Sequence, residues 1–243
     1  MNAAPADQRR LLEIADLDAR IRRAEHERAH PPQAARIQEL ATHRQELSRE
    51  LAEKAGARDD LKAELKRVES DVEVVDARRV RDESRLQAVT NPKDAQGLES
   101  ELASLARRKS DLEDAELELM ERLDAIEAAV GEQEGLIADT NAEGARLTQE
   151  AKDVVAGADA ALDAARRDRA AVAGTIPAEL VALYERLTAR SAGAAPLVRQ
   201  TCEGCRMVLS GTDLHTLRQT ADDVVANCPE CGCILVRTEE SGL

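Results

Sequence analysis

The sequence predicts a mainly α-helical protein, in which a long antiparallel coiled-coil hairpin precedes a small C-terminal β domain. Three observations predict it: a sustained heptad pattern, a near-absence of aromatic residues, and cysteines confined to the C-terminus. The 243 residues include 44 alanines, and Tyr184 is the only aromatic residue. Large aromatic side chains usually dominate compact cores, and this composition is instead typical of long helices and coiled coils.

Apolar residues recur at alternating steps of three and four along two segments. The first repeat runs from Ile37 to Val89, and 11 of its 16 seam positions are apolar. The second runs from Leu98 to Val172 without a skip, with 16 of 22 positions apolar. A sustained 3.5-residue period in both segments predicts a coiled coil. Between Ala151 and Ala165 the predicted seam is mostly alanine, at Ala151, Ala158, Ala161 and Ala165.

Two breaks divide the helical region. Asn91 is a good N-cap and Pro92 suits a first helical position, so the sequence predicts the hairpin tip near residues 90–95. Pro31 and Pro32 remove two amide donors, which predicts a kink near 30–32. At 1.5 Å per residue, the second arm is about 110 Å long and the first arm is of similar length. We therefore expect residues 1–173 to form the antiparallel hairpin.

Several seam positions carry polar residues, and two interpretations stay open. Buried polar residues can fix the register of a coiled coil, or they can mark a groove for a partner. The positions are Arg44, Lys54, Arg58, Arg79, Asp82, Lys109 and Glu116.

Residues 174–195 read as a connection and residues 196–243 as a separate β domain. Pro177 should open a short helix with Leu180, Leu183, Tyr184 and Leu187 on one face, and 191–195 should be a flexible break. We expect a helical turn from 212 to 217, capped by Thr212. Strand-like runs flank it, at 197–199, 207–209, 224–226 and 234–236.

All five cysteines lie in this last segment. Cys202 and Cys205 form one CxxC pair, Cys228 and Cys231 form another, and 22 residues separate the pairs. Two such pairs can place four thiolates around one tetrahedral Zn²⁺, so we predict a four-cysteine zinc ribbon with one structural zinc per chain. Two interpretations of Cys233 stay open: it competes with these cysteines as a zinc ligand, or it is a free thiol in the next strand. With so few large apolar side chains, the ribbon should depend on its metal to fold.

Charge and motifs narrow the function classes. The formal charge is −14, which argues against a general nucleic-acid coat. No apolar run approaches membrane-spanning length and no signal peptide is evident, so we expect a cytoplasmic protein without membrane contact. Four thiolates leave no open zinc position for water. We therefore expect neither an enzyme nor a small-molecule substrate.

The combination of motifs resembles the bacterial C4-type zinc ribbon domain family, and its actinobacterial members in particular. The resemblance lies in the tip Thr90-Asn91-Pro92-Lys93-Asp94, in Tyr184-Glu185-Arg186, and in the Cys202-Glu203-Gly204-Cys205-Arg206-Met207 and Cys228-Pro229-Glu230-Cys231-Gly232 runs. It implies zinc on the same four cysteines. Cys233 is a departure, because relatives usually carry arginine there. Some members are described as adaptors or chaperones for transcription and motility components, and RNA binding has been proposed for one branch.

Two functional hypotheses follow. The first is a non-enzymatic zinc-binding adaptor, scaffold or chaperone-like protein that binds protein partners through the coiled coil and the ribbon. The second is an RNA- or DNA-binding regulatory protein that uses the ribbon, the basic hairpin tip, or both. The acidic ribbon and the missing aromatic stacking platforms oppose the second hypothesis. Its candidate contact residues are Arg78, Arg79, Arg81, Arg85, Lys93, Arg107, Arg108 and Lys109.

Overall fold

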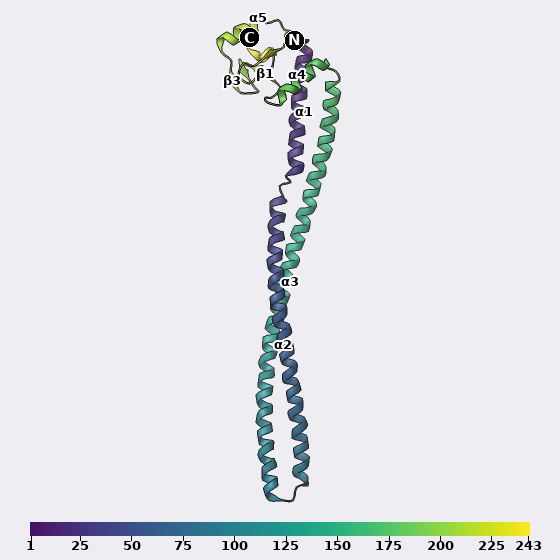
Figure 1. Cartoon of the computed structure of the whole chain (residues 1–243), viewed down its shortest axis with the longest axis vertical. Helices are drawn as coiled ribbons and strands as arrows, with labels where there is room; N and C mark the ends of the chain where they lie inside the picture. Colours follow the sequence, from purple (N-terminus) through teal and green to yellow (C-terminus); the bar gives the residue numbers. More distant parts are fainter. The chain divides into compact units, whose positions relative to one another are not determined.

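The computed structural model describes all 243 residues, which form two compact units: residues 35–148, and residues 1–34 with 149–243. The predicted fold class is confirmed, with a long helical hairpin and a small C-terminal strand region (Figure 1). None of the helices combines the length and the hydropathy needed to span a bilayer. The helices are α1 (Pro5–Ala29), α2 (Ala34–Ala88), α3 (Pro92–Ala173), α4 (Ala178–Thr188) and α5 (Gly211–Gln219). The remaining elements are β1 (Ala194–Val198), β2 (Thr201–Cys202), β3 (Met207–Val208), β4 (Ala226–Asn227), β5 (Ile234–Val236) and the 3₁₀ helix η1 (Glu239–Ser241).

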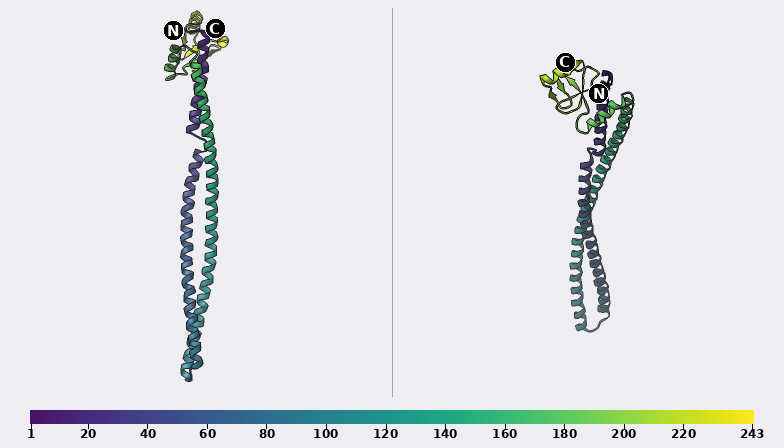
Figure 2. Two further views of the ribbon diagram at one scale, coloured as in Figure 1. Left: turned by 90° about the vertical axis from the view of Figure 1, so that its right-hand side faces the viewer. Right: turned by 45° about the horizontal axis from the view of Figure 1, so that its top comes forward.

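In the unit of residues 35–148, hereafter the hairpin unit, α2 and the first part of α3 run side by side and antiparallel (Figures 1 and 2). Ion pairs show the direction, because Arg36 meets Glu143 at 3.0 Å while Lys62 meets Glu127 at 2.7 Å. At the tip, the side-chain oxygen of Asn91 accepts a hydrogen bond from the amide of Lys93 at 3.0 Å. This bond satisfies one of the orphan donors at the start of α3.

The hairpin unit buries one seam of side chains along its length. Leucines supply most of it, while Asp82 and Gln133 are buried polar members at 3% and 2% exposure. All of these side chains stand at positions of the heptad repeats. The buried apolar members are Leu40, Leu47, Leu105, Leu112, Leu119 and Val130.

In the other unit, hereafter the ribbon unit, α1 pairs with residues 149–173 of α3 through ion pairs such as Arg166 to Glu25 at 2.9 Å. The heptad expectation is wrong at two seam positions here, because Ala161 and Asp168 are exposed while Leu162 is buried. A straight helix drifts relative to a 3.5-residue repeat, so the buried face passes from Ala158 to Leu162 and then Ala165. The larger leucine therefore faces the core, and the seam is less dominated by alanine than expected.

The strands form one sheet in the order β3-β2-β1-β5-β4, with β1 parallel to β5 and the other pairs antiparallel. The expected flexible break at 191–195 is wrong at its end, because Ala194 and Ala195 already pair with Ile234 and Leu235. Their small side chains are 3% and 4% exposed, so this stretch is fixed by packing. Where a strand was expected to continue through residue 199, Arg199 and Gln200 have φ of 46° and 68°. They form the two-residue turn that reverses the chain from β1 into β2.

Two other local expectations need correction. The cap of α5 is Ser210 and not Thr212, since the Ser210 side chain accepts a hydrogen bond from the Asp213 amide at 3.2 Å. The strand expected at 224–226 begins only at Ala226, because Val224 forms an isolated bridge with Asn2. A local hydrogen bond three residues long decides the first of these boundaries, and a contact with the distant N-terminus decides the second.

Candidate metal centre

Two tight turns of the same design present the four CxxC cysteines. In the first turn the amide of Arg206 donates to the carbonyl of Cys202 at 2.6 Å, and in the second the amide of Gly232 donates to the carbonyl of Cys228 at 2.9 Å. Both donors have left-handed backbone angles, with φ of 60° for Arg206 and 75° for Gly232. Glycine adopts this conformation without strain, which explains Gly232 after the second pair.

The thiol sulfurs of Cys202, Cys205, Cys228 and Cys231 all lie within 4.8 Å of one another. The Sγ atoms of Cys205 and Cys228 are 3.8 Å apart, and those of Cys202 and Cys231 are 4.0 Å apart. A zinc–sulfur bond of about 2.3 Å in a tetrahedron requires sulfur–sulfur edges of about 3.8 Å. The donor set therefore fits one structural Zn²⁺, which would balance part of the thiolate charge and tie the two turns together.

The protonation state of these thiols makes metal binding depend on pH. Burial raises the pKa of the Cys202 thiol to about 12 and raises the pKa of the Cys233 thiol further. Without a metal, both groups are therefore neutral thiols at physiological pH. Zinc ligands must be thiolates, so binding has to release protons, and the affinity must fall as the pH falls.

The ribbon unit has two small cores, and the cysteines belong to the first of them. On one face of the sheet, Leu235 of β5 packs with the cysteines, while its neighbours Ile234 and Val236 face the other way and pack with α1 and α4. The second core also contains fully buried Leu11, Ile14 and Leu180. The apolar residues on the cysteine side are Ala195, Leu197, Leu209, Leu214, Leu217 and Leu235.

A polar network reinforces the second core. The hydroxyl of Tyr184 in α4 donates to the carboxylate of Asp18 in α1 at 2.7 Å, and Arg169 of α3 donates to the same carboxylate at 2.6 Å. Arg169 also reaches Glu185 at 3.1 Å. These bonds join three helices beneath the sheet. Burial and the bond to Asp18 also raise the pKa of Tyr184 above its usual value.

The N-terminal residues make hydrogen bonds to the ribbon that sequence reasoning did not predict. The amide of Ala3 donates to the carbonyl of Asp223 at 2.7 Å, and that of Val225 donates to the carbonyl of Met1 at 3.0 Å. Gln8 is 2% exposed and donates to the carbonyl of Asp222 at 3.0 Å. These contacts are mostly between backbone groups, so no residue pattern at the N-terminus indicates them.

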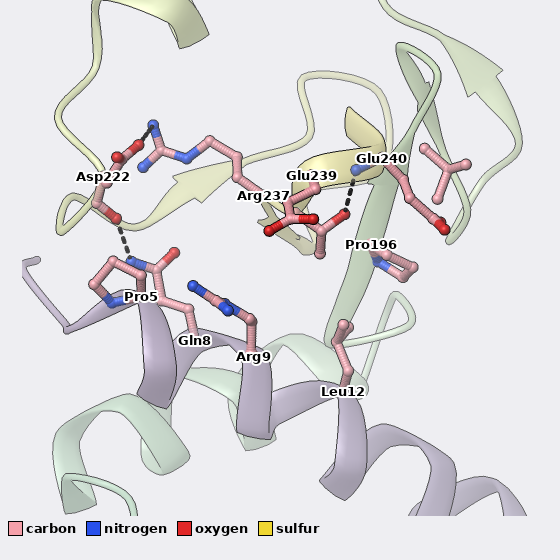
Figure 3. Close-up of a pocket in the computed structure, with 11 residues that line it drawn as sticks. Pro5, Gln8, Arg9, Leu12, Pro196, Asp222, Arg237, Glu239 and Glu240 are labelled. Carbon is pink, nitrogen blue, oxygen red and sulfur yellow. Dashed lines mark hydrogen bonds and ion pairs between the residues drawn. The ribbon is translucent and has the colours of Figure 1, made fainter. Parts of the chain in front are cut away.

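A pocket of about 690 Å³ lies between α1 and the ribbon (Figure 3). Arg9 and Leu12 line it from α1, and Pro196, Glu239 and Glu240 line it from the ribbon. Arg237 extends along one wall. Its guanidinium donates to the carbonyls of Leu217, Thr220, Ala221 and Val224, so it closes the loop after α5.

The eight basic residues near the hairpin tip do not form a single positive surface. Arg78 pairs with Glu101, Arg79 with Glu83, Arg85 with Asp82, and Lys109 with Asp76. Arg81 donates to the carbonyl of Ala77 in its own helix. The side chains of the three remaining residues make no ion pair or hydrogen bond: Lys93, Arg107 and Arg108.

Three of the polar seam residues, Lys54, Lys109 and Gln133, make hydrogen bonds across the hairpin. Lys54 donates to the side-chain oxygen of Gln133 at 2.6 Å, and the side-chain nitrogen of Gln133 donates to the carbonyl of Leu47 at 3.1 Å and to Glu50 at 2.9 Å. Asp76 and Lys109 make a second cross-helix pair at 2.7 Å. Gln133 was not singled out among the polar seam residues, although its place in the heptad repeat is a signal that could have found it.

His215 is exposed on α5 and contacts Gln219, so it takes no part in the thiol cluster. Cys233 does lie at the cluster. It is fully buried, and its sulfur lies 3.4 Å from that of Cys231 and 3.6 Å from that of Cys202.

Comparisons with known proteins agree with this architecture. Residues 14–192 match the model of the CT398-like coiled coil hairpin domain, and residues 201–235 match that of the C4-type zinc ribbon domain. Uncharacterized protein Rv2229c of Mycobacterium tuberculosis is 35% identical over 98% of both chains. A solved structure from Mycobacterium smegmatis is 32% identical, covers 98% of this chain and 100% of its own, and has a TM-score of 0.82.

A more distant solved structure, CT398 from Chlamydia trachomatis, shares the fold with a TM-score of 0.61 at 18% identity, covering 96% of this chain and 98% of its own. The family resemblance expected from the tip, the Tyr184 segment and the two CxxC pairs is thus confirmed, including its actinobacterial character. The chain belongs to the CT398-like coiled-coil hairpin family and carries a C4-type zinc ribbon.

Proposed function

We propose that this protein is a non-enzymatic adaptor, in which Cys202, Cys205, Cys228 and Cys231 hold one structural zinc and the protein surfaces bind protein partners. The observation that carries the proposal is the closed donor set. Four sulfurs within 4.8 Å of one another complete a zinc shell and leave no position for a reacting water. Such a centre stabilises a fold and does not catalyse a reaction.

Exposed apolar side chains support partner binding. On the hairpin unit, Leu117 and Met120 are exposed one turn apart on α3. On the ribbon, Met207 and Val208 are exposed on β3, which is an edge strand with unpaired backbone groups. Exposed apolar residues that cluster often mark interaction sites, and an edge strand can accept an extended partner segment.

Affinity capture with cross-linking in cells of the source organism would test the adaptor. Two matched variants separate the surfaces: Leu117→Ser/Met120→Ser on the hairpin, and Met207→Ser/Val208→Ser on the ribbon. We expect each variant to lose the partners that cross-link to its own surface and to retain its fold. A third variant would lack the tip side of the hairpin, between Lys62 and Glu127. If all three variants recovered the same partners as the unmodified chain, the adaptor proposal would be rejected.

Nucleic-acid binding is the second candidate, and one observation favours it. Arg107 and Arg108 have no acidic partner, and with Ser104, Ser110 and Asp111 they line a depression of about 460 Å³ on α3. Cations that make no ion pair can contact phosphates and release counterions. Lys93, at the tip, is a further free cation.

Titrations of zinc-loaded protein with RNA and duplex DNA over a range of salt concentrations would test this candidate. Arg107→Glu/Arg108→Glu should abolish binding and flatten its salt dependence. Arg22→Glu/Arg23→Glu makes the same charge change on exposed α1 residues, and it should leave the affinity largely unchanged. No binding by the unmodified protein at low salt would remove nucleic acid as a partner.

A further inference from the structure

The thiol cluster contains five sulfurs, although the tetrahedral site needs four. The sulfur of Cys233 lies 3.4 Å from that of Cys231 and 3.6 Å from that of Cys202, and the latter two are 4.0 Å apart. These three sulfurs form a nearly equilateral triangle. Its sides are close to the edge of about 3.8 Å that a zinc tetrathiolate requires.

Cys233 therefore stands at ligand distance from one edge of the site. It contacts the sulfurs of Cys202 and Cys231, while Cys205 and Cys228 contact each other on the opposite edge at 3.8 Å. A thiol in this place can substitute for a neighbour on its own edge with little movement. No sulfur–sulfur contact joins Cys233 to Cys205 or Cys228.

The backbone around Cys233 is arranged to bring its thiol to this position. Gly232 has φ of 75°, which places Cys231 and Cys233 on the same side of a tight turn. A Cβ on Gly204 would lie 3.2 Å from the Cys233 sulfur. The first CxxC turn thus leaves space for the Cys233 thiol because it has glycine between its two cysteines.

Of the two cysteines whose sulfurs contact Cys233, Cys231 is the more exposed. Cys231 is half-buried, whereas Cys202 and Cys233 are fully buried. Solvent, electrophiles and competing chelators therefore reach Cys231 before they reach Cys233. Cys231 is thus one of the two half-buried ligands of the proposed set, with Cys205, and it stands beside a buried thiol of the same chemistry.

We propose that Cys233 is a reserve ligand of the zinc centre, which takes the place of Cys231 when that thiolate leaves the metal. In the exchange the Zn–S bond to Cys231 breaks and one to Cys233 forms. Cys233 gives up its proton and the Cys231 thiolate takes one up, so the charge and the ligand number of the centre stay the same. The inference rests on the proposed ligand set and deepens it.

Co²⁺ titration of the full chain tests the proposal, because the thiolate-to-metal absorption reports how many sulfurs bind the metal. Cys231→Ser should retain a four-thiolate cobalt spectrum, and Cys231→Ser/Cys233→Ser should show three thiolates. Since even outer partners of a metal site contribute about 10–100-fold to affinity, the double variant should bind at least about tenfold more weakly than Cys231→Ser. A three-thiolate spectrum in Cys231→Ser would overturn the proposal.

Matched variants on the opposite edge sharpen the test. Cys205→Ser should lose the four-thiolate spectrum, and adding Cys233→Ser should change its cobalt affinity little. Cys233→Ser alone should keep one cobalt with four thiolates. If the unmodified chain itself gave fewer than four thiolates, the proposed ligand set would fail, which distinguishes that failure from failure of the exchange.

Discussion

The hairpin unit and the ribbon unit bury their apolar side chains in different ways. In the hairpin unit the buried leucines form a single row, and members such as Leu40 and Leu105 remain 6% and 9% exposed. In the ribbon unit Leu11, Leu180 and Leu197 are completely buried. A two-helix seam leaves every side chain near solvent, whereas helices packed on a sheet can enclose theirs.

This difference determines how far a local loss of structure spreads in each unit. Each turn of the hairpin unit contacts only the turn opposite, so a local defect should stay local, as in other quasi-one-dimensional folds. The ribbon unit joins α1, α4, the N-terminal residues and the sheet through shared cores. Its parts should therefore lose structure together.

Loss of a proposed zinc ligand should have the largest effect. Cys228→Ser removes a sulfur that is 2% exposed, and structural zinc sites contribute about 10–16 kcal/mol of apparent folding free energy in zinc-finger peptides. We expect the variant to lose its zinc and the ribbon to unfold at a lower temperature. Zinc analysis and near-UV circular dichroism of Tyr184, the only aromatic residue, would measure both. Cys233→Ser is the control, and equal zinc loss in both variants would contradict the assigned ligands.

Cavities should be more damaging in the ribbon unit than in the hairpin unit. Leu180→Ala creates a cavity in an enclosed core, and this substitution should reduce the free energy of unfolding by about 2–5 kcal/mol. Leu119→Ala opens a gap beside solvent, where the neighbours can relax, so it should fall at the low end of that range. Denaturant titrations followed by Tyr184 and by far-UV circular dichroism would separate the two units. A larger loss for Leu119→Ala would break the comparison.

The buried polar seam of the hairpin unit provides a smaller test. Gln133→Ala leaves the half-buried Lys54 ammonium without its partner and removes the extra bond to the Leu47 carbonyl, and an unsatisfied buried group costs about 1–3 kcal/mol. Gln45→Ala changes an exposed glutamine of α2, and its effect should stay within about 0.5 kcal/mol. Equal stability of the two variants, measured by far-UV circular dichroism, would show that the bonds of Gln133 do not stabilise the hairpin unit.

Acid should have the smallest effect on the hairpin unit. Hydrogen bonds from Lys109 and Lys62 lower the pKa values of Asp76 and Glu127. Their contribution is therefore present above the unfolded pKa values and disappears as the pH falls through the folded ones. Since exposed pairs contribute little, we expect a slight drop in melting temperature between neutral pH and pH of about 3. Asp76→Asn/Glu127→Gln should show a shallower drop, and an equally steep drop would assign the acid sensitivity to other groups.

The sequence was most informative where short-range patterns decide the structure. The heptad repeats placed Leu112 and Leu119 in the seam, and Asn91 with Pro92 marked the start of α3. The CxxC spacing brought together four sulfurs from residues far apart in the chain. Each of these features depends on residues a few positions apart or on one strongly constraining chemistry.

The features that escaped sequence reasoning depend on tertiary contacts. Ala194 and Ala195 looked like a flexible break, but pairing with β5 makes them a central strand. The N-terminal residues bind the ribbon through backbone groups, which carry no residue signature. Leu162 is buried where the heptad repeat predicted Ala161. The drift of a straight helix from a 3.5-residue repeat is small in each turn, but it accumulates along a long arm.

Amide exchange of the full chain with zinc bound and with zinc removed tests the central claim most directly. We predict that removing zinc strips protection from residues 197–235, around the thiol cluster, and leaves residues 105–130 of the hairpin unit unchanged. The first result would show that the ribbon depends on its metal, and the second that the hairpin unit is held by its own seam. Protection that is unchanged in both regions, or lost in both together, would contradict the account.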